Sequence, residues 1–382
     1  MPFRIPSARI NWTNSSFLIG TAVATCTAVP LYLWNYGVDG FQIGLFLFFF
    51  ISTGLSITLG YHRLFAHVAF QARWPVRFFT LVFGAAAFEN AALNWVSDHR
   101  RHHKNVDSDD DPYDITKGFW HAHIGWILFK LDPEPPLDNV ADLRKDRLVL
   151  WQDRYYVPIA VVVGFLLPAG LGWLHAGWIG ALGGLLLGGV ARVTAVQHMT
   201  FFINSLCHTI GRQPYSDKCS ARDSWIMALF TFGEGYHNYH HEFQHDYRNG
   251  VKWWHWDPTK WTIWSLEKIA LARGLRRVPE EKVLLTQLAD TRRRLNERLA
   301  CRKTELNARL RELLQSSEIK LHHLGERWTL LKASYAGRAE ALKAEYAEKA
   351  AHQMDEARTA LAEIRREIYQ ALALLEMAGA PA

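Results

Sequence analysis

Residues 17–67 read FLIGTAVATCTAVPLYLWNYGVDGFQIGLFLFFFISTGLSITLGYHRLFAH, and this stretch is apolar over most of its length. Up to Gly60 its only charged residue is Asp39, which separates two apolar segments, Phe17–Trp34 and Phe41–Gly60. Each segment is close to the roughly 20 apolar residues that a helix needs to cross a bilayer. We therefore expect two membrane-spanning helices, the second of which ends in a histidine-containing motif.

A second apolar stretch, Tyr155–Ala191, contains no charged residue apart from the titratable His175. Glycines within Gly172–Trp178 suit a tight turn at its middle. The length of the stretch then accommodates two more helices that cross the membrane. The sequence therefore predicts four membrane spans in total.

The segment Pro75–Ala92 is also apolar, but it carries Glu89 and Asn90. A crossing at this point would place the motifs before and after it on opposite sides of the membrane. We therefore expect a helix that lies at the cytoplasmic interface rather than a fifth span.

Lysine and arginine residues flank the predicted spans on one side, and the two short loops on the other side contain none. The flanking residues are Arg4, Arg9, Arg63, Arg73, Arg77, Lys145, Arg147, Arg154, Arg192 and Arg212. By the positive-inside rule, both termini and the segment between the second and third spans face the cytoplasm. The chain is thus predicted to be a multi-pass protein of the lipid bilayer.

The last hundred residues differ in composition from the rest of the chain. Residues 280–382 hold 34 of the 80 charged side chains, and their apolar residues recur at spacings of three and four. This pattern predicts a long helix or helical hairpin with coiled-coil character, which could serve self-association. We expect two domains, residues 1–279 and 280–382. Basic residues are scattered rather than gathered in a stripe, which argues against nucleic-acid binding.

Nine of the 18 histidines form a pattern at the predicted cytoplasmic ends of the spans. Three boxes carry eight of them: GYHRLFAH (60–67), DHRRHH (98–103) and GEGYHNYHH (233–241), and NSLCH (204–208) adds one more. The nine are His62, His67, His99, His102, His103, His208, His237, His240 and His241. Spacings of three and four place imidazoles on one helix face. The spacing of five in the first box does so only if the helix ends or unwinds near His62.

Nine imidazoles are too many for one metal ion and suffice for two ions with four or five ligands each. Imidazole suits zinc, copper, iron and nickel, so the ligand type alone leaves the ion open. A redox metal beside lipid favours attack on unactivated C–H bonds, which oxygen activated at reduced iron can perform. Neutral ligands leave the charge of the ions uncompensated, so we expect Asp98 and Glu234 to hold the rings.

The boxes, their order and the apolar hairpin between the second and third resemble the membrane fatty acyl desaturases, and are most similar to the Δ9 acyl-CoA desaturases of the stearoyl-CoA type. The resemblance covers roughly residues 15–275. It implies an all-α integral membrane fold with four transmembrane helices, a cytosolic cap with two irons, and a bent hydrophobic tunnel. It also implies that the nine histidines ligate the irons and that Asn204 holds a metal-bound water.

The implied reaction removes two hydrogens from adjacent methylenes of a long-chain saturated acyl substrate. It consumes O2 and two external electrons and yields a cis double bond and two waters. The sequence contains no flavin or NAD fingerprint, no ferredoxin cysteine set and no haem HPGG motif. The electrons are therefore expected from a separate protein, ferredoxin-like or cytochrome b5-like with its reductase.

The head-group positions match the family less well than the boxes do. Asn90 and Asp98 match residues that contact the CoA head group, whereas Ser97 replaces an arginine there. Lys130 is followed by Leu131 where a basic pair is usual. We favour an acyl-CoA substrate, with a lipid-bound or carrier-bound chain as the alternative.

The tunnel positions also match in part. Trp95 and Thr200 match residues at the bend of the tunnel, while Glu89 and Phe201 stand where glutamine and tryptophan are usual. Phe50 and Gly54 correspond to the residues that close the far end. Because Gly54 should leave space, we expect Phe50 to be the wall that limits chain length.

Two other functions remain open from the sequence. A fatty-acid or alkane hydroxylase, or a ketolase, would share the same iron site and differ only in the fate of the second hydrogen. A membrane metal-binding or transport protein is the other alternative, but transport sites lie near the bilayer midplane. The predicted position of these histidines at helix ends favours the enzyme.

Overall fold

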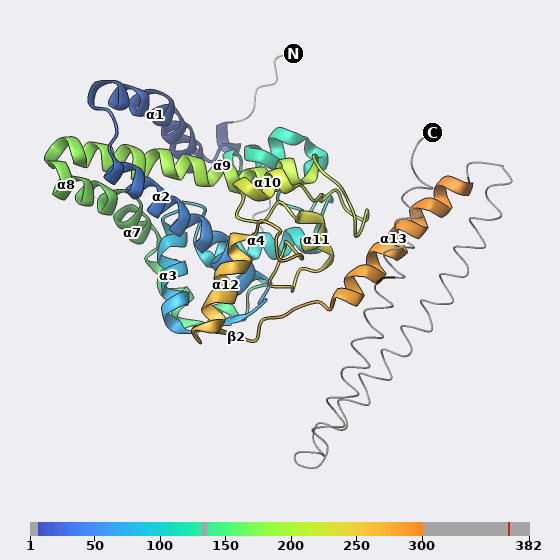
Figure 1. Ribbon diagram of the computed structural model, residues 1–382. Coiled ribbons are helices and arrows are strands. Elements are labelled where there is room, and N and C mark those ends of the chain that lie inside the picture. Colours follow the sequence, from blue (N-terminus) through green and yellow to red (C-terminus); the bar gives the residue numbers. More distant parts are fainter. Residues whose placement is uncertain (1–6, 131–135, 301–365, 367–382) are drawn as a thin grey trace, which may run out of the picture. The chain divides into compact units, whose positions relative to one another are not determined.

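The computed structural model describes residues 7–130, 136–300 and 366, and it is mainly helical, as predicted (Figure 1). The chain forms two compact units, Met1–Gln213 with Asp217–Arg277, and Pro214–Ser216 with Val278–Ala382. The α-helices of the first unit are α1 (Trp12–Tyr36), α2 (Gly40–Leu55), α3 (Trp74–Ala85), α4 (Ala92–Asn105), α5 (Trp126–Leu128), α6 (Arg147–Arg154), α7 (Tyr156–Val161), α8 (Leu167–Gly183), α9 (Arg192–Ser205), α10 (Trp225–Phe230), α11 (His237–Glu242) and α12 (Pro258–Lys268).

Shorter turns of 3-10 or π geometry extend several of these helices. The π segments are η2 (Ser56–Ala66), η4 (His121–Gly125), η6 (Val162–Leu166) and η7 (Gly184–Ala191). The 3-10 turns are η1 (Ser7–Arg9), η3 (Ile115–Lys117), η5 (Leu143–Lys145) and η8 (Leu206–His208). Because η2 follows α2 without a break, residues 40–66 form one continuous helical stretch.

Side-chain caps fix the starts of the first two long helices. The side chain of Asn11 accepts a hydrogen bond from the Asn14 N–H at the start of α1. Asp39 and Gln42 form a reciprocal capping box at the start of α2, which satisfies two otherwise unpaired N–H groups. The charged residue that divides the apolar sequence thus begins the second helix.

Three helical stretches are long and apolar enough to cross a membrane: Trp12–Tyr36, Gly40–Ala66 and Tyr156–His208. The third has 53 residues, and a straight helix of that length would measure about 80 Å, far more than the bilayer core. Its backbone leaves the helical conformation at Ala176 and at Gly177, where φ is +58°. This break lies inside the turn predicted at Gly172–Trp178.

The two arms of this third stretch pack against each other through glycines. A Cβ atom on Gly180 would overlap the carbonyl oxygen of Gly172, and one on Gly184 would overlap that of Pro168. Further from the turn, Gly189 packs against Phe165. These pairs run in opposite directions along the chain, as in an antiparallel hairpin, and small residues at such contacts are typical of membrane helices. The count of four spans nevertheless stays a prediction.

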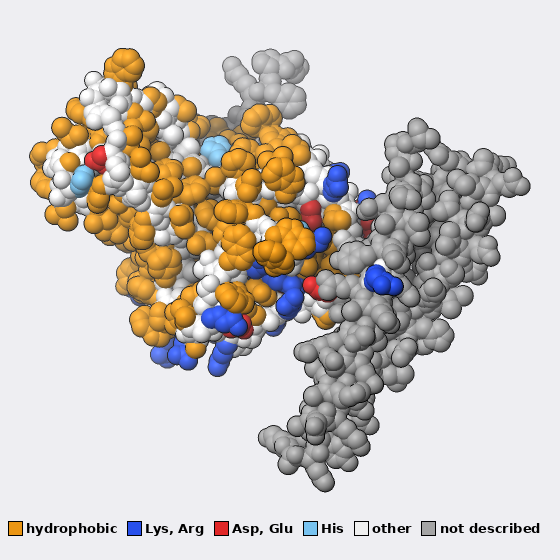
Figure 2. All heavy atoms as spheres, in the orientation of Figure 1, with side chains coloured by type: hydrophobic (Ala, Val, Ile, Leu, Met, Phe, Trp, Pro, Cys, Tyr) orange, Lys and Arg blue, Asp and Glu red, His pale blue; other side chains and the backbone are white. Residues whose placement is uncertain are grey.

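Figure 2 shows hydrophobic side chains spread over much of the visible surface, with lysine and arginine side chains towards one edge. The exposed apolar residues on the long helices include Leu31, Phe48 and Leu174. Monomeric soluble proteins rarely expose apolar surface of this extent. The distribution therefore fits contact with lipid.

Arg192 is buried at the start of α9 and ties three segments together. Its guanidinium donates to the carbonyl oxygens of Ala86, Gly164 and Gly188, at distances between 2.5 and 3.0 Å. The chain after α3 is therefore fixed to the third apolar stretch. This connection holds the α3–α4 turn, which faces the candidate site.

The helix predicted over Pro75–Ala92 is shorter than expected, because α3 ends at Ala85. Phe88 and Asn90 adopt positive φ angles of 58° and 86°, which no α-helix can include. With 12 residues, α3 is too short to cross a bilayer, which agrees with the expectation that this segment is not a fifth span. Glu89 and Asn90 thus lie in a turn, and not in a helix.

The segment that follows the third histidine box packs against the segment that follows the first box. The two-residue strands β1 (Gln71–Ala72) and β2 (Ala272–Arg273) pair in antiparallel register, Gln71 with Arg273. A buried apolar cluster of the first unit includes Tyr61, Phe70, Val96 and Ile263, which come from η2, the β1 region, α4 and α12. The core of the unit therefore lies directly under the residues that carry the histidines.

The second unit contains α13 (Glu280–Ala300), and the division into domains at residues 279 and 280 stays a prediction. On its surface Arg293 pairs with Asp290 and with Glu297, at the spacings of three and four typical of a helix. The predicted coiled-coil pairing of the remaining tail lies outside the described residues. Self-association through the tail stays a prediction.

Candidate metal centre

The structure brings the nine box histidines together in two groups. His62, His67, His99, His103 and His240 form the five-histidine group, and His102, His208, His237 and His241 form the four-histidine group. Within each group, one ring nitrogen of every residue lies within 4.8 Å of one from every other member. Residues separated by more than 170 positions in the sequence thus share one site.

Helices α4 and α11 divide their histidines between the groups in complementary ways. In α4, His99 and His103, four residues apart, belong to the five-histidine group, and His102 belongs to the other. In α11, the pair four apart, His237 and His241, belongs to the four-histidine group, while His240 belongs to the first. The two helices therefore connect the groups. If each group holds one metal ion, α4 and α11 each supply ligands to both ions.

The first box reaches the five-histidine group through π-helical geometry. The N–H of His67 donates to the carbonyl oxygen of His62 at 3.0 Å, an i+5 to i hydrogen bond. Such a bond places residues five apart on one face, whereas a regular α-helix would separate them. The rings of His62 and His67 have centroids 4.7 Å apart. The condition set by the spacing of five, that the helix unwinds near His62, is met.

The distances between ring nitrogens match those of ligands on a shared ion. Nε2 of His240 lies 3.0 Å from Nε2 of both His62 and His103. Nε2 of His237 lies 3.1 Å from Nε2 of both His208 and His241. Two imidazole nitrogens bound to one ion at about 2.0–2.1 Å lie about 2.9–3.4 Å apart for angles between octahedral and tetrahedral. The residues present therefore fit two metal ions.

The protonation of the rings also suits metal binding. Burial, and then the neighbouring imidazoles, hold the pKa of His99, His103 and His240 far below the ordinary histidine value. The same causes act on the pKa of His237 and His241. These rings are therefore neutral and offer a lone pair, which is the form that binds a metal.

Glu234 supports the five-histidine group, as the sequence predicted. Its Oε2 lies 3.0 Å from Nδ1 of His62 and accepts a hydrogen bond of 2.6 Å from Asn249. Its Oε1 accepts two hydrogen bonds from Arg63, at 2.8 and 3.2 Å. Arg63 is completely buried and also pairs with Asp257 at 3.0 Å. This network orients His62 so that Nε2 faces the group.

The four-histidine group is supported by residues that the sequence analysis missed. His102 donates from Nδ1 to Asp111, whose two carboxylate oxygens lie at 2.9 and 3.0 Å. His208 donates from Nδ1 to the Ser220 hydroxyl at 2.7 Å, and that hydroxyl donates to Asp107 at 2.5 Å. Asp107 and Asp111 belong to the acidic run that follows the second box, which was the available signal.

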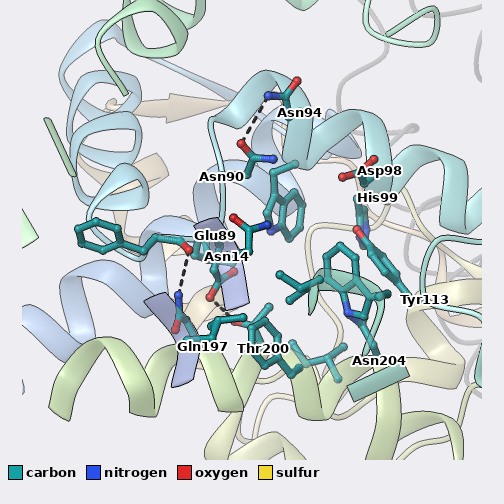
Figure 3. Close-up of a pocket in the computed structure, with 18 of the residues that line it drawn as sticks. Asn14, Glu89, Asn90, Asn94, Asp98, His99, Tyr113, Gln197, Thr200 and Asn204 are labelled. Carbon is teal, nitrogen blue, oxygen red and sulfur yellow. Dashed lines mark hydrogen bonds between the residues drawn. The ribbon is translucent and has the colours of Figure 1, made fainter. Parts of the chain in front are cut away.

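A pocket of about 590 Å³ runs past both groups (Figure 3). His62 and His99 of the five-histidine group and His237 of the four-histidine group line it. Six of the predicted substrate or water positions line it as well: Asn90, Trp95, Asp98, Thr200, Phe201 and Asn204. Asp98, which was expected to hold a histidine ring, thus faces the pocket.

Glu89 joins two walls of the pocket, as Figure 3 shows. Its Oε1 accepts a hydrogen bond of 2.8 Å from the Thr200 hydroxyl, which joins the α3–α4 turn to α9. Among the described residues, its Oε2 is buried without a partner. Burial raises the pKa of Glu89 to about 8, so the carboxyl is mainly protonated at neutral pH.

The two residues predicted to close the tunnel are placed differently from expectation. The space beside Gly54 is filled, because a Cβ atom there would overlap the ring of Phe232. Phe50 lies behind that ring, with centroids 5.6 Å apart. Gly54 lines a separate cavity of about 10 Å³. The expectation of free space at Gly54 was wrong, because a residue far away in the sequence occupies it.

Comparison with known proteins identifies relatives over most of the first unit. A family model described as fatty acid desaturase matches residues 40–269, more than half of the chain. Acyl-CoA desaturase 1 of Saccharomyces cerevisiae is 36% identical over 300 residues, which cover 76% of this chain and 56% of the yeast protein.

Two further relatives match over a similar part of this chain. A probable acyl-CoA desaturase of Schizosaccharomyces pombe is 43% identical over 240 residues, 62% of this chain and 49% of that protein. The sn-1 stearoyl-lipid 9-desaturase of Anabaena variabilis is 32% identical over 269 residues, 70% of this chain and 94% of that protein. The chain thus spans about half the length of the two fungal relatives and nearly all of the cyanobacterial one.

Proposed function

This chain belongs to the fatty acid desaturase family, and we propose that it introduces a cis double bond, at the Δ9 position, into a long-chain saturated acyl substrate. In balanced form, one saturated chain, O2, two electrons and two protons give one unsaturated chain and two waters. The relatives support this proposal, since their names state acyl-CoA and stearoyl-lipid desaturases.

One observation carries the proposal: a single pocket is lined by histidines from both groups. His62, His99 and His237 would place two metal ions beside whatever the pocket holds. A volume of about 590 Å³ is within the range of sites that enclose a small-molecule ligand. A long acyl chain that enters from the Lys130 side would therefore pass the metal centre before it reaches the inner end of the pocket.

We propose that the nine histidines hold two irons, with Asn204 holding a water on one of them. Bound iron would supply the activation of O2 and the removal of hydrogen from carbon. The protein supplies the rest. Glu234 and Asp111 hold His62 and His102 in fixed orientations. Trp95, Thr200 and Phe201 shape the wall against which the chain would rest, and so select the carbons presented to the irons.

The favoured substrate is an acyl-CoA. Among the described residues that line the pocket, Lys130 is the single lysine or arginine, and Asn90 and Asp98 lie on the same lining. The backbone N–H of Lys130 donates to the carbonyl oxygen of Arg9 at 2.8 Å, so a second cationic residue lies next to it in the structure. A phosphate-bearing head group would meet these cations outside the apolar part of the pocket.

We also propose four spans, with the termini and the metal centre on the cytoplasmic side. The antiparallel hairpin within Tyr156–His208 supports the count, and the basic residues support the orientation. The electrons would come from a ferredoxin-like or cytochrome b5-like protein with its reductase.

The test uses the purified chain in bilayers with iron, a reducing donor pair and labelled stearoyl-CoA. We expect two irons per chain and a product with one cis double bond at Δ9, located by mass spectrometry. A hydroxylated product would assign the chain to the hydroxylases. If the irons are bound and the donor is oxidised at the expense of O2, but the acyl chain stays unchanged, the proposed reaction is refuted.

A further inference from the structure

The inner end of the pocket adjoins the small cavity. Thr58, Thr200 and Ile203 line both, so the two spaces lie on either side of the same three side chains. Thr58 precedes His62 by one helical turn on η2, and Thr200 and Ile203 belong to α9. An extension of the pocket past these three side chains would therefore lead into the small cavity.

Phe232 fills the space beyond these residues. It lines the small cavity, and its ring lies directly on the backbone of Gly54. Any side chain at Gly54 would overlap the ring, so the Phe232 ring can occupy this position only because residue 54 is glycine. Phe50, one turn earlier in α2 than Gly54, packs against the ring, and the two ring planes are tilted by 38°.

The backbone of Phe232 adopts an unfavourable conformation that places the ring in this position. Phe232 has a φ angle of 53°, which is strained for an aromatic residue and persists only where the surroundings determine it. The carbonyl oxygen of Phe232 accepts a hydrogen bond of 2.9 Å from Thr259, whose hydroxyl lies 2.7 Å from that of Thr58. The ring position is thus coupled to the helix that lines the pocket.

We propose that Phe232 ends the path of the acyl chain and sets the greatest chain length that the site accepts. The proposal rests on the proposed function, since it assumes an acyl chain in the pocket. Phe50 then supports the wall rather than forming it. A hydrophobic pocket discriminates by roughly 10–200-fold for each methylene group that it can or cannot hold. Removing the ring should therefore change the limit strongly.

The experiment measures equilibrium binding and kcat/KM for a series of saturated acyl-CoAs of increasing length. For Phe232→Ala we expect at least about a tenfold gain in kcat/KM for the first chain that the wild type rejects. Phe230→Ala is the matched control, because Phe230 is two residues away and exposed. It should leave the length profile unchanged.

Gly54→Ala tests the same wall from the other side and does not depend on how the first variant folds. The added methyl group must displace the Phe232 ring, so the length limit should shift, and Phe232→Ala should remove that shift in the double variant. An unchanged length profile in Phe232→Ala, with irons and turnover retained, would overturn the proposal. So would a shift in Gly54→Ala that persists in the double variant.

Failure of the proposed function would look different. If no variant and no wild-type protein forms a double bond, the binding series still reports the length limit of the pocket. If binding to the wild type weakens beyond a certain chain length, and this length increases in Phe232→Ala, the result would support Phe232 as the end of the pocket although the reaction had been misassigned. Binding that is independent of length in every protein would refute it.

Discussion

The five-histidine and four-histidine groups share a pocket and two helices, but they are supported by different chemistry. Glu234 supports the first group from a fully buried network with Arg63, Asp257 and Asn249. The second group is supported from two loops, by Asp111 after α4 and by Ser220 between η8 and α10. The first support belongs to the core, so its loss should disturb both ligands and fold. The second is more local, so its loss should disturb mainly the ligands.

The largest effect should follow removal of a ligand from either group. His240→Ala and His102→Ala should each lower turnover by more than about 100-fold, because even indirect supports of a ligand change metal affinity by 10–100-fold. Membrane insertion should persist, since the apolar helices are unchanged. Turnover and iron content of the purified variants are the measurements.

His198→Ala is the matched control, because His198 bonds to His123 at 3.1 Å and belongs to neither group. Wild-type turnover in both ligand variants would break the comparison at its base, since neither group would then hold a catalytic metal.

The next largest effect separates the two kinds of support. Glu234→Gln and Asp111→Asn should each weaken metal binding by about 10–100-fold. Glu234→Gln should also lower stability by about 1–3 kcal/mol, because buried Arg63 loses part of its pairing. Metal titration and thermal unfolding measure the two effects separately.

Asp257→Asn is the control for Glu234→Gln, since Asp257 also bonds to Arg63, whereas the carboxylate that lies 3.0 Å from Nδ1 of His62 belongs to Glu234. It should lower stability with little effect on metal affinity. Equal losses of stability in the Glu234 and Asp111 variants would show that the two supports do not differ in kind.

A smaller effect is expected for Ser220→Ala. The variant removes the hydroxyl that orients His208 and leaves Asp107 without that partner. A neutral hydrogen bond contributes about 1 kcal/mol, so metal affinity should fall by only about fivefold. Competition with a chelator would measure the change. A loss as large as that of Asp111→Asn would place more of the support in this serine.

The smallest effect at neutral pH concerns the pocket between the groups. Glu89 has its pKa raised to about 8 by burial, so it is mainly neutral below that pH and ionises above it. An ionised carboxylate keeps water in the pocket, and KM for the acyl chain should therefore rise above pH 8 in the wild type. Glu89→Gln should match the wild type near pH 7 and show no such rise. Identical pH profiles of KM would contradict this.

The sequence predicted the histidines of the second and third boxes from their helical spacings of three and four, whereas the first box, with its spacing of five, and His208, outside the boxes, needed the resemblance to the family as well. It could not divide them into groups, since spacing shows which side chains share a face but not which helix that face meets. His99 and His102 are three apart, yet they belong to different groups.

Supporting residues were harder to predict where loops place them. Glu234 lies within the third box and was found, whereas Asp111 depends on the fold of an acidic loop and was missed. Phe232 was missed for a related reason. Its ring fills the space at Gly54 from a residue with positive φ, and neither the separation nor the backbone conformation leaves a periodic signal.

The π-helical segment η2 also determines where insertions and deletions can be tolerated. Between His62 and His67 the chain holds one residue more than an α-helical turn needs. A deletion there would restore α-geometry and still leave two histidines on one face. A single deletion in Phe46–Ser52 would instead turn the earlier part of α2 by about 100° relative to the site and so move its buried face away from the helices it packs against. The spacing between His62 and His67 should therefore tolerate a change from five to four, whereas α2 should not tolerate a change in length.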